Sequence, residues 1–191
     1  MVVNERYDFC YFPVPKAASS TTKRLLYEIE HGEKYEAERP SGQSIGIHKV
    51  YKTVDFSRID VQRIQGCWKF TIIRDPIARI LSCYNDKILR KRIMHKKKPT
   101  PRQPADEHAI FHSLDKDPSL DNFCTNIRDY RKASNAIRRH TEHFAVFLGN
   151  DLSFFDRVYR VEEMDEVIED LKRKTERHIA PLVRNRSHSQ I

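Results

Sequence analysis

The sequence predicts an α/β fold, a three-layer sandwich with a mostly parallel central sheet. Three short runs that are rich in apolar and β-favouring residues have the length and composition of buried strands. Each run leads through a polar turn into a segment with apolar residues at helical spacing. The three expected strands are residues 7–14, 67–73 and 157–161. Alternation of strands and helices along one chain is typical of a parallel sheet covered by helices.

The first expected strand, residues 7–14, is ended by prolines, which cannot donate hydrogen bonds to a sheet. A lysine, two alanines and four hydroxyl residues follow, and we expect the hydroxyl side chains to cap the next helix. That helix is expected over residues 20–31, with Gly32 at its end. The start of such a helix aims backbone N–H groups and the positive end of the helix dipole at one point. With Lys16 beside it, the turn predicts an anion-binding site.

The following segment carries weaker signals. Residues 33–45 are polar and are expected to form a loop, whereas residues 46–52 alternate weakly in hydrophobicity, which favours a short strand. A short helix is expected at residues 57–64. The strand at residues 67–73 is nearly continuous in apolar residues, as expected at the centre of a parallel sheet.

Arg74, Asp75 and Pro76 link this strand to the next helix. Asp75 is a suitable N-cap, and Pro76 suits the first helical turn because it lacks an N–H group. We expect one apolar face of the helix to point inward, formed by Ile77, Ile80, Leu81, Tyr84, Ile88 and Leu89.

Residues 90–104 depart from this pattern because they are dense in Lys, Arg and Pro. We expect a mobile basic loop there that buries little surface. Residues 118–132 show helical spacing, and residues 134–147 carry basic side chains before an apolar FAVF. The strand at 157–161 is followed by a helix at 163–174. This last helix is expected to bury Met164, Val167, Ile168 and Leu171.

The composition indicates a globular chain with an anionic partner. Of 191 residues, 35 are Lys or Arg and 27 are Asp or Glu, which gives a net charge of +8. Such a balance favours nucleic acid, a membrane surface, a nucleotide or an acidic glycan. The chain has only five glycines, which argues against a glycine-rich nucleotide loop. Its four cysteines lack CxxC spacing, so we expect reduced, buried thiols and neither a metal site nor a disulfide framework.

Neither a targeting segment nor a membrane span is expected. The N-terminal sequence has no charged leader before a long apolar stretch, and no apolar run approaches the length of a span. We therefore expect a soluble, cytoplasmic chain without stable membrane insertion. At this length we expect a single domain, residues 1–191, in which residues 90–140 form a basic variable segment.

Two turns are the strongest candidates for chemistry, since ligands of parallel sheets bind beyond the carboxyl ends of the strands. One turn contains Lys16, and the other contains Arg74. Ser82 lies about two helical turns beyond Arg74, so both side chains can donate hydrogen bonds to one phosphate group. Arg79, between them, is expected to tie the turn together or to pair with an acid.

Taken together, PKAASST at residues 15–21 and RDPIARILSCY at residues 74–84 resemble the motifs of sulfotransferases that use 3′-phosphoadenosine 5′-phosphosulfate (PAPS). That family pairs a phosphosulfate loop of the form PKxxST with a 3′-phosphate element of the form RDPxxRxxSxY. The chain is most similar to the carbohydrate, Golgi-type branch (sulfotransferase family 2-like) and its bacterial relatives. The segments FFDRVYRVEEMDEV and NRS also resemble family elements, so the resemblance covers most of the chain outside residues 90–140. It implies the P-loop-like sulfotransferase fold.

The resemblance also implies roles in binding PAPS and its product PAP. Lys16 would bind the bridging oxygen and the phosphosulfate, while Arg74 and Ser82 would hold the 3′-phosphate. The 5′-phosphate and the sulfonate would be cradled by Ala17, Ala18, Ser19, Ser20 and Thr21, through hydroxyls and backbone amides. Near the C-terminus, the nucleotide would be closed over by Asn185, Arg186 and Ser187. The loop has Ser-Ser where the family often has Ser-Thr or Gly-Thr, a change that keeps the donors.

Transfer to a hydroxyl acceptor requires a general base, and histidine has the suitable pKa range. The carbohydrate branch places its base shortly before a DF-type segment, which implies His48; His140, His143 or a carboxylate are the alternatives. The expected acceptor is a glycan or glycolipid, contacted by Lys49, Arg90, Lys91 and His140 on the variable side of the chain. Further cations there fit a polyanionic acceptor: Arg92, Lys96, Lys97 and Lys98.

Two other functions compete with sulfonate transfer. A P-loop kinase that uses ATP is disfavoured because GxxxxGK[ST] is absent and no glycine separates Lys16 from the hydroxyls. A nucleic-acid-binding protein is supported only by charge, without interleaved aromatic residues, so no nucleic-acid partner is expected. Transfer from PAPS is the preferred prediction and needs no metal. Whether the chain forms a homodimer is left open.

Overall fold

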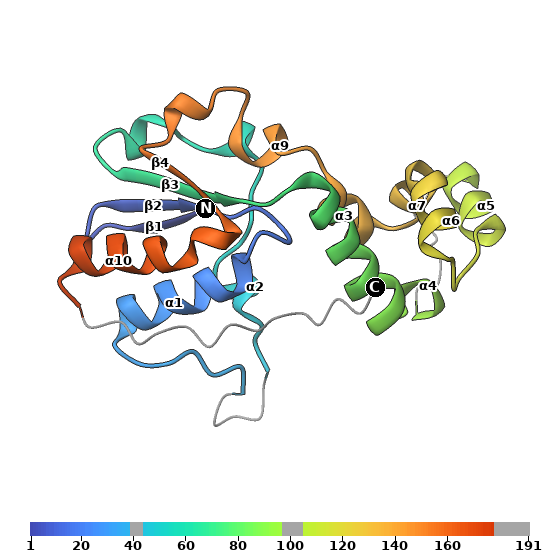
Figure 1. Ribbon diagram of the computed structural model, residues 1–191, viewed down its shortest axis with the longest axis horizontal. Helices are drawn as coiled ribbons and strands as arrows, with labels where there is room; N and C mark the ends of the chain where they lie inside the picture. The colour runs from blue at the N-terminus through green and yellow to red at the C-terminus, as the bar shows by residue number, and fades with distance from the viewer. Residues whose placement is uncertain (39–43, 97–104, 178–191) are drawn as a thin grey trace.

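The computed structural model describes residues 1–38, 44–96 and 105–177. Its centre is a sheet of four strands in the order β1-β2-β3-β4 (Figure 1). The strands are β1 (Val2–Asn4), β2 (Phe9–Phe12), β3 (Trp68–Ile73) and β4 (Arg157–Arg160). β1 runs antiparallel to β2, and the other neighbouring pairs are parallel. The expected α/β fold with a mostly parallel sheet is confirmed, and β1 is a strand that the sequence did not predict.

The register of the parallel strands brings the two candidate turns to one edge of the sheet. Phe12, the last residue of β2, pairs with Thr71 near the end of β3. Because β2 and β3 run in the same direction, the segments that follow them leave the sheet side by side. Arg74 joins these segments, since its Nη1 donates a hydrogen bond to the carbonyl oxygen of Lys16 at 3.5 Å.

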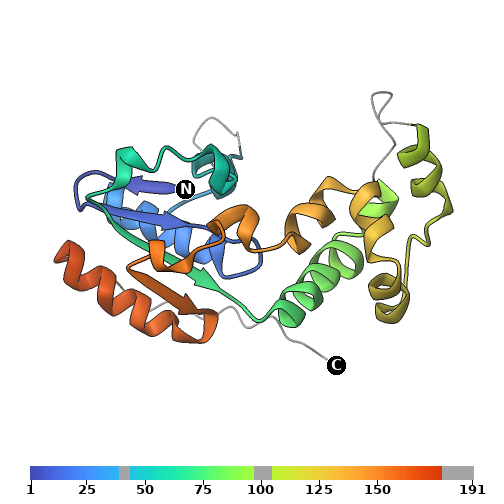
Figure 2. The same cartoon turned by 90° about the horizontal axis from the view of Figure 1, so that it is seen from above.

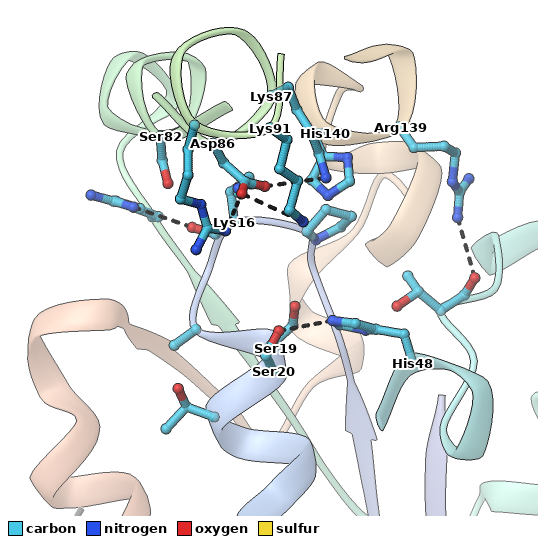
Figure 3. Close-up of a pocket in the computed structure, with 16 residues that line it drawn as sticks. Lys16, Ser19, Ser20, His48, Ser82, Asp86, Lys87, Lys91, Arg139 and His140 are labelled. Carbon is cyan, nitrogen blue, oxygen red and sulfur yellow. Dashed lines mark hydrogen bonds and ion pairs between the residues drawn. The ribbon is translucent and has the colours of Figure 1, made fainter. Parts of the chain in front are cut away.

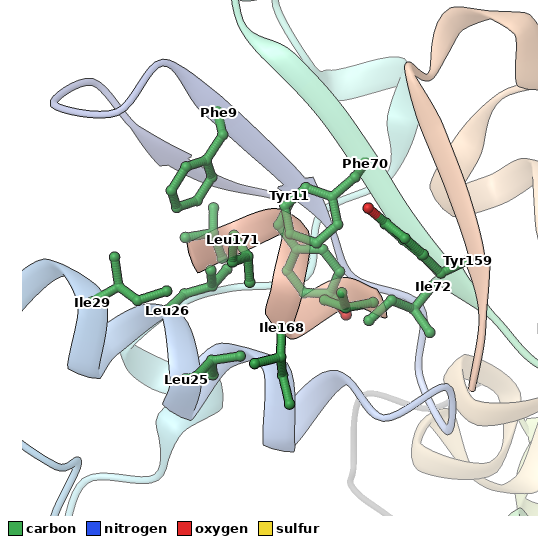
Figure 4. Close-up of a cluster of buried hydrophobic side chains, with 12 residues drawn as sticks. Phe9, Tyr11, Leu25, Leu26, Ile29, Phe70, Ile72, Tyr159, Ile168 and Leu171 are labelled. Atoms are coloured by element: carbon green, nitrogen blue, oxygen red, sulfur yellow. The ribbon is translucent and has the colours of Figure 1, made fainter. Parts of the chain in front are cut away.

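Two long helices cover one face of the sheet. α1 (Ser19–His31) and α10 (Met164–Thr175) lie side by side against it in Figure 1. The rings of Tyr11 and Phe70 stack in the core beneath them, with their centroids 5.0 Å apart. Figure 4 shows this core, which comprises Val2, Phe9, Tyr11, Leu25, Leu26, Ile29, Phe70, Ile72, Tyr159, Val167, Ile168 and Leu171. Both expected helices are confirmed, as is the left-handed Gly32 that ends α1, with a φ of 78°.

Short helical segments cover the opposite face. They are η1 (Phe56–Arg58), η2 (Gln62–Ile64), α9 (Ala145–Leu148) and η4 (Leu152–Phe154). With β2 and the turn after it they form a second core, comprising Cys10, Phe12, Val14, Ala17, Ile64, Phe147, Leu148 and Phe155. Helical segments on both faces make the sheet the middle of three layers. The single helix expected at residues 57–64 is wrong, because Asp60 accepts a hydrogen bond from the N–H of Gln62 at 3.1 Å and interrupts it.

Gly149 follows α9 at a position that requires glycine. Its φ of 75° and ψ of −174° form a combination almost confined to glycine, and an added Cβ would lie 2.9 Å from the ring of Phe56. We expect Gly149→Ala to lower the free energy of unfolding by about 1–3 kcal/mol. Urea unfolding measures this loss, with Gly66→Ala as control, because a Cβ at Gly66 meets no atom within 4 Å. Equal stability of the two variants would contradict the prediction.

α3 (Pro76–Tyr84) begins as the sequence predicts. Asp75 is its N-cap and accepts a hydrogen bond at 2.8 Å from the backbone N–H three residues farther on. The helix continues as a π-helical segment, η3 (Asn85–Arg90). The expected inward face is wrong at Ile77 and Leu89, which are 69% and 57% exposed. α3 leaves the edge of the sheet (Figure 1), and the wider π-helical turn shifts the side-chain pattern after it.

Short helices beyond α3 form a lobe beside the sheet (Figure 2). They are α4 (Ile93–Lys96), α5 (Ala105–Ser113), α6 (Leu120–Thr125), α7 (Ile127–Ala133) and α8 (Asn135–Thr141). The lobe has a core of its own, comprising Cys83, Tyr84, Ile88, Met94, Phe111, Phe123, Tyr130, Ala133 and Ile137. The helix expected over residues 118–132 is divided at Asn126, which ends α6 and precedes α7.

The loop expected over residues 90–104 is wrong in its first part. Residues 93–96 form α4, and Met94 is only 1% exposed because it fills the core of the lobe. Arg92 pairs with Asp117, with 2.9 Å between guanidinium and carboxylate. The density of charged residues therefore led to a wrong prediction of a loop here, because the core of the lobe buries the few apolar residues of this segment. Residues 97–104 lie outside the described residues.

The four cysteines are free, as expected. Cys10 and Cys83 are buried, whereas Cys67 is half-buried and Cys124 is exposed, so burial was predicted correctly for only part of the set. Burial raises the pKa of Cys10 to about 12 and that of Cys83 to about 11, which keeps both thiols protonated. Across the described ranges, no helix combines the length and hydrophobicity needed to cross a bilayer.

Candidate active site

The turn between β2 and α1 keeps backbone amides available to a ligand. Lys16 and Ala18 have φ angles of 67° and 53°, a conformation that non-glycine residues rarely adopt. Ala18 is the N-cap of α1, and no side chain caps the helix, so the expected capping role of the hydroxyls is wrong. The left-handed Ala18 places the hydroxyls inside the first helical turn instead. Since the first N–H groups of a helix lack partners within it, the turn presents donors to an anion.

A cleft of about 570 Å³ opens at this turn (Figure 3). It is lined by Pro15, Lys16, Ala18, Ser19, Ser20, Thr21, His48, Thr53, Arg74, Ser82, Asp86, Lys87, Arg90, Lys91, Arg139 and His140. Six of these residues are Lys or Arg, and one is a carboxylate. An excess of positive charge in a concave site favours a ligand with several negative charges.

Lys16 is held in the cleft by Asp86. Its Nζ lies 2.5 Å from the Asp86 carboxylate, and the two side chains are only 14% and 12% exposed. Asp86 also contacts Lys87 at 3.1 Å and the guanidinium of Arg90. Burial alone would raise the pKa of Asp86, but the hydrogen bonds from Lys16 and Arg90 hold that pKa well below its usual range. The π-helical turn of η3 thus gathers these charges around one ionised carboxylate.

The structure brings the two sequence motifs together. Arg74 and Ser82, from the end of β3 and from α3, line the same cleft as Lys16. Arg79, between them in sequence, is 4% exposed and donates hydrogen bonds to the carbonyl oxygens of His140, at 3.4 Å, and of Glu142. Burial lowers the pKa of Arg79 to about 10. Arg79 therefore ties α3 to the end of α8, which differs from both roles expected for it, tying its own turn together or pairing with an acid.

His48 lies at the side of the cleft on α2 (Ile47–Val50), so the strand expected at residues 46–52 is wrong. No strand among the described residues pairs with the segment, and Ile47 is buried at 3% exposure on one side of a helical turn. His48 Nε2 lies 2.8 Å from the Ser20 hydroxyl, as Figure 3 shows. Partial burial, then the charge of Lys23, lowers the pKa of His48 to about 4, so the imidazole is neutral at pH 7.

A second cavity of about 380 Å³ lies beside the first. It shares His48, Thr53 and Arg139 with the cleft and is otherwise lined by Lys52, Val54, Asp55 and Arg58. Arg139 is fixed by an ion pair with Asp55 and by a 3.2 Å hydrogen bond to the carbonyl oxygen of Thr53. His48 therefore belongs to the walls of two adjoining cavities.

Sequence reasoning missed several residues of the cleft, notably Thr53, Asp86, Lys87 and Arg139. The ion pair of Asp86 with Arg90 could have been predicted, because the two residues are four positions apart on a helical segment. Lys87 is 8% exposed and is paired with Asp86, which its position in a charged run did not indicate. Thr53 and Arg139 come from segments far apart in the chain, so no local pattern links them.

The remaining candidates are divided between the cleft lining and other places in the structure. Ala17 is buried and its N–H donates to the carbonyl oxygen of Val14 at 3.3 Å, inside the turn. Lys49 is exposed, and His143 is exposed with its Nδ1 accepting from the N–H of Ala145 at 3.2 Å. His140 lines the cleft, and burial lowers its pKa to about 4. The candidates of the C-terminal segment lie outside the described residues: Asn185, Arg186 and Ser187.

Comparison with known proteins points to one family. Carbohydrate sulfotransferase 11 of Rattus norvegicus is 28% identical to the chain over 94 residues, and the protein of that name from Mus musculus gives the same figures. The match covers 48% of this chain but only 27% of the length of each relative. No solved structure matches the chain significantly. The model of the sulfotransferase family, in contrast, matches residues 1–191, and the chain therefore belongs to the sulfotransferase family.

Proposed function

We propose that the protein transfers a sulfonate group from PAPS to a hydroxyl group of a carbohydrate or glycolipid acceptor. The observation that supports this most is the convergence of the two motifs on one cationic cleft. PAPS carries a phosphosulfate at one end and a 3′-phosphate at the other, so it needs cations at two places. Lys16 and the start of α1 provide one place, and Arg74 with Ser82 provides the other.

Each residue has a distinct task in the proposed reaction. When bound, PAPS supplies the sulfonate, whose bond to the bridging phosphate oxygen breaks as the acceptor oxygen binds the sulfur. Lys16 stabilises the negative charge that grows on the bridging oxygen. The amides of the first turn of α1 and the hydroxyls of Ser19 and Ser20 orient the transferred group. His48 accepts the proton of the acceptor hydroxyl, and its neutral imidazole at pH 7 suits that role.

The acceptor is proposed to enter through the second cavity. His48 lines both this cavity and the donor cleft, so an acceptor that enters there can reach the imidazole next to the donor loop. Arg90, Lys91 and His140, which the sequence assigned to the acceptor, line the donor cleft itself. The charges of Lys52 and Arg58 would hold an acceptor with acidic groups, and such contacts weaken in salt.

We expect Arg74→Gln to weaken PAP binding by about 10- to 100-fold, because a charge-assisted hydrogen bond contributes roughly 1.5–3 kcal/mol. Binding of AMP, which lacks the 3′-phosphate, should change by no more than about twofold. Isothermal titration calorimetry with both nucleotides measures the difference. Arg63→Gln is the matched control, since Arg63 is 68% exposed and pairs with Glu5 outside the cleft. Equal losses for PAP and AMP would refute the 3′-phosphate assignment.

Donor binding and transfer together test the proposed function. We expect PAP to bind more tightly than ATP, and PAPS to label hydroxyl-bearing glycans in a mass-shift assay. Tighter binding of ATP would favour a kinase, and a gel shift with nucleic acid at physiological salt would favour a nucleic-acid-binding protein. The absence of PAP and PAPS binding would reject the proposal.

A further inference from the structure

Lys23 is a buried lysine that the proposed reaction has not yet used. It lies on α1 with a relative exposure of 0%, far from the charged surface where lysines are usually found. Its Nζ donates a hydrogen bond to the Thr53 hydroxyl at 2.8 Å and lies 3.3 Å from Nδ1 of His48. None of the ion pairs between described residues involves Lys23. Burial of an ammonium group without a carboxylate partner lowers the stability of the fold. The position of Lys23 beside the candidate base therefore suggests a functional role.

The charged groups that act on His48 are all basic. They are Lys23 and Arg24 of α1, with Lys87 and Lys91 of the cleft lining. The N-terminal amino group of Met1, just before β1, interacts with Lys23. Burial lowers the pKa of Lys23 to about 8. The side chain can therefore exist as an ammonium or as a neutral amine close to physiological pH.

We propose that Lys23 is a positioning residue that sets which ring nitrogen of His48 carries the proton. The direction of the hydrogen bond between Nζ of Lys23 and Nδ1 of His48 depends on whether Lys23 is protonated. A Lys23 ammonium donates to Nδ1, so the proton of the neutral imidazole must reside on Nε2, which then points to Ser20 as a donor. A neutral Lys23 amine accepts from Nδ1–H, and Nε2 keeps its lone pair.

Only the second form makes Nε2 a base on the side of the donor loop. Nε2 lies 2.8 Å from the hydroxyl of Ser20, which lines the cleft, whereas Nδ1 faces the buried amine. Loss of one proton from Lys23 thus switches Nε2 of His48 from donor to acceptor. This inference rests on the proposed function of His48 as the base, but the tautomer itself can be observed without turnover.

The turnover of the wild-type protein should rise about tenfold between pH 7 and pH 9, since the neutral fraction of a group with a pKa of about 8 rises by that factor. Lys23→Met has nearly the same length and no charge, so its turnover should be flat over this range. Lys23→Arg keeps the charge at every pH and should lose about 10²-fold in turnover at pH 9. If Lys23 served only as a structural positive charge, Lys23→Arg would keep more turnover than Lys23→Met, which is the opposite result. PAP binding by each variant reports whether the variant is folded.

The decisive measurement is nitrogen-15 NMR of the histidine rings, with the His48 signals assigned by their loss in His48→Gln. In the wild type, the proton of the neutral ring should move from Nε2 to Nδ1 as the pH rises through about 8. In Lys23→Met, this change should be absent. An identical tautomer in both proteins from pH 6.5 to pH 9.5 would overturn the inference. A tautomer switch in a protein that transfers no sulfonate would support the inference and reject the proposed function.

Discussion

Lys16→Met should lower the rate of sulfonate transfer by about 10³-fold, while PAP affinity should fall only about tenfold. Removal of one donor aimed at a developing negative charge costs about 10²–10³ in rate, and Lys16 contributes a full charge from a side chain that is 14% exposed. PAP lacks the bridging bond that breaks, so it loses only ground-state attraction. Single-turnover transfer from labelled PAPS measures the rate, and calorimetry measures the affinity.

The fold should survive this substitution. Asp86 keeps contacts with Lys87 and Arg90, so its carboxylate is not left unpaired. The control is Lys34→Met, the same change at an exposed residue outside both cavities, which should keep transfer within about twofold of the wild type. A Lys16→Met protein that retained a tenth of the wild-type rate would rule out the assigned role.

His48→Gln should reduce transfer by about 10²–10⁴-fold, which is the contribution of a well-placed general base. PAP affinity should stay within about twofold, because the neutral ring of His48 brings no charge to the nucleotide. Steady-state rates with a saturating acceptor and PAP titrations give the two quantities. His31→Gln is the control, since His31 lies at the far end of α1 from the cleft and stacks on Tyr27.

A different outcome would relocate the base. Full activity in His48→Gln, together with a large loss in His140→Gln, would assign the proton transfer to His140, which lines the same cleft. Equal losses in transfer and in PAP binding for His48→Gln would make His48 a donor-binding residue.

Local signals predicted the parts of this molecule that depend on neighbours in sequence. Prolines and apolar runs identified β2 and β3, and Asp75 was predicted correctly as the N-cap of α3. The same signals failed where packing decided the outcome. Ile47 and its neighbours form a helical turn, and no strand of the described residues pairs with them. Met94 is buried because a lobe of helices surrounds it.

By itself, the sequence determined the parallel strands β2, β3 and β4, the helices α1, α3 and α10 that follow them, and the identity of the two turns. Hydrophobic spacing, proline and capping residues act over a few positions and are sufficient for these elements. Only the tertiary structure decided that Lys16 meets Asp86, 70 positions away, and that Lys23 lies against His48, 25 positions away. Those contacts depend on how α1, α2 and η3 pack around the edge of the sheet. No local pattern encodes them, since side chains from different elements approach one another only when the sheet and its helices are assembled.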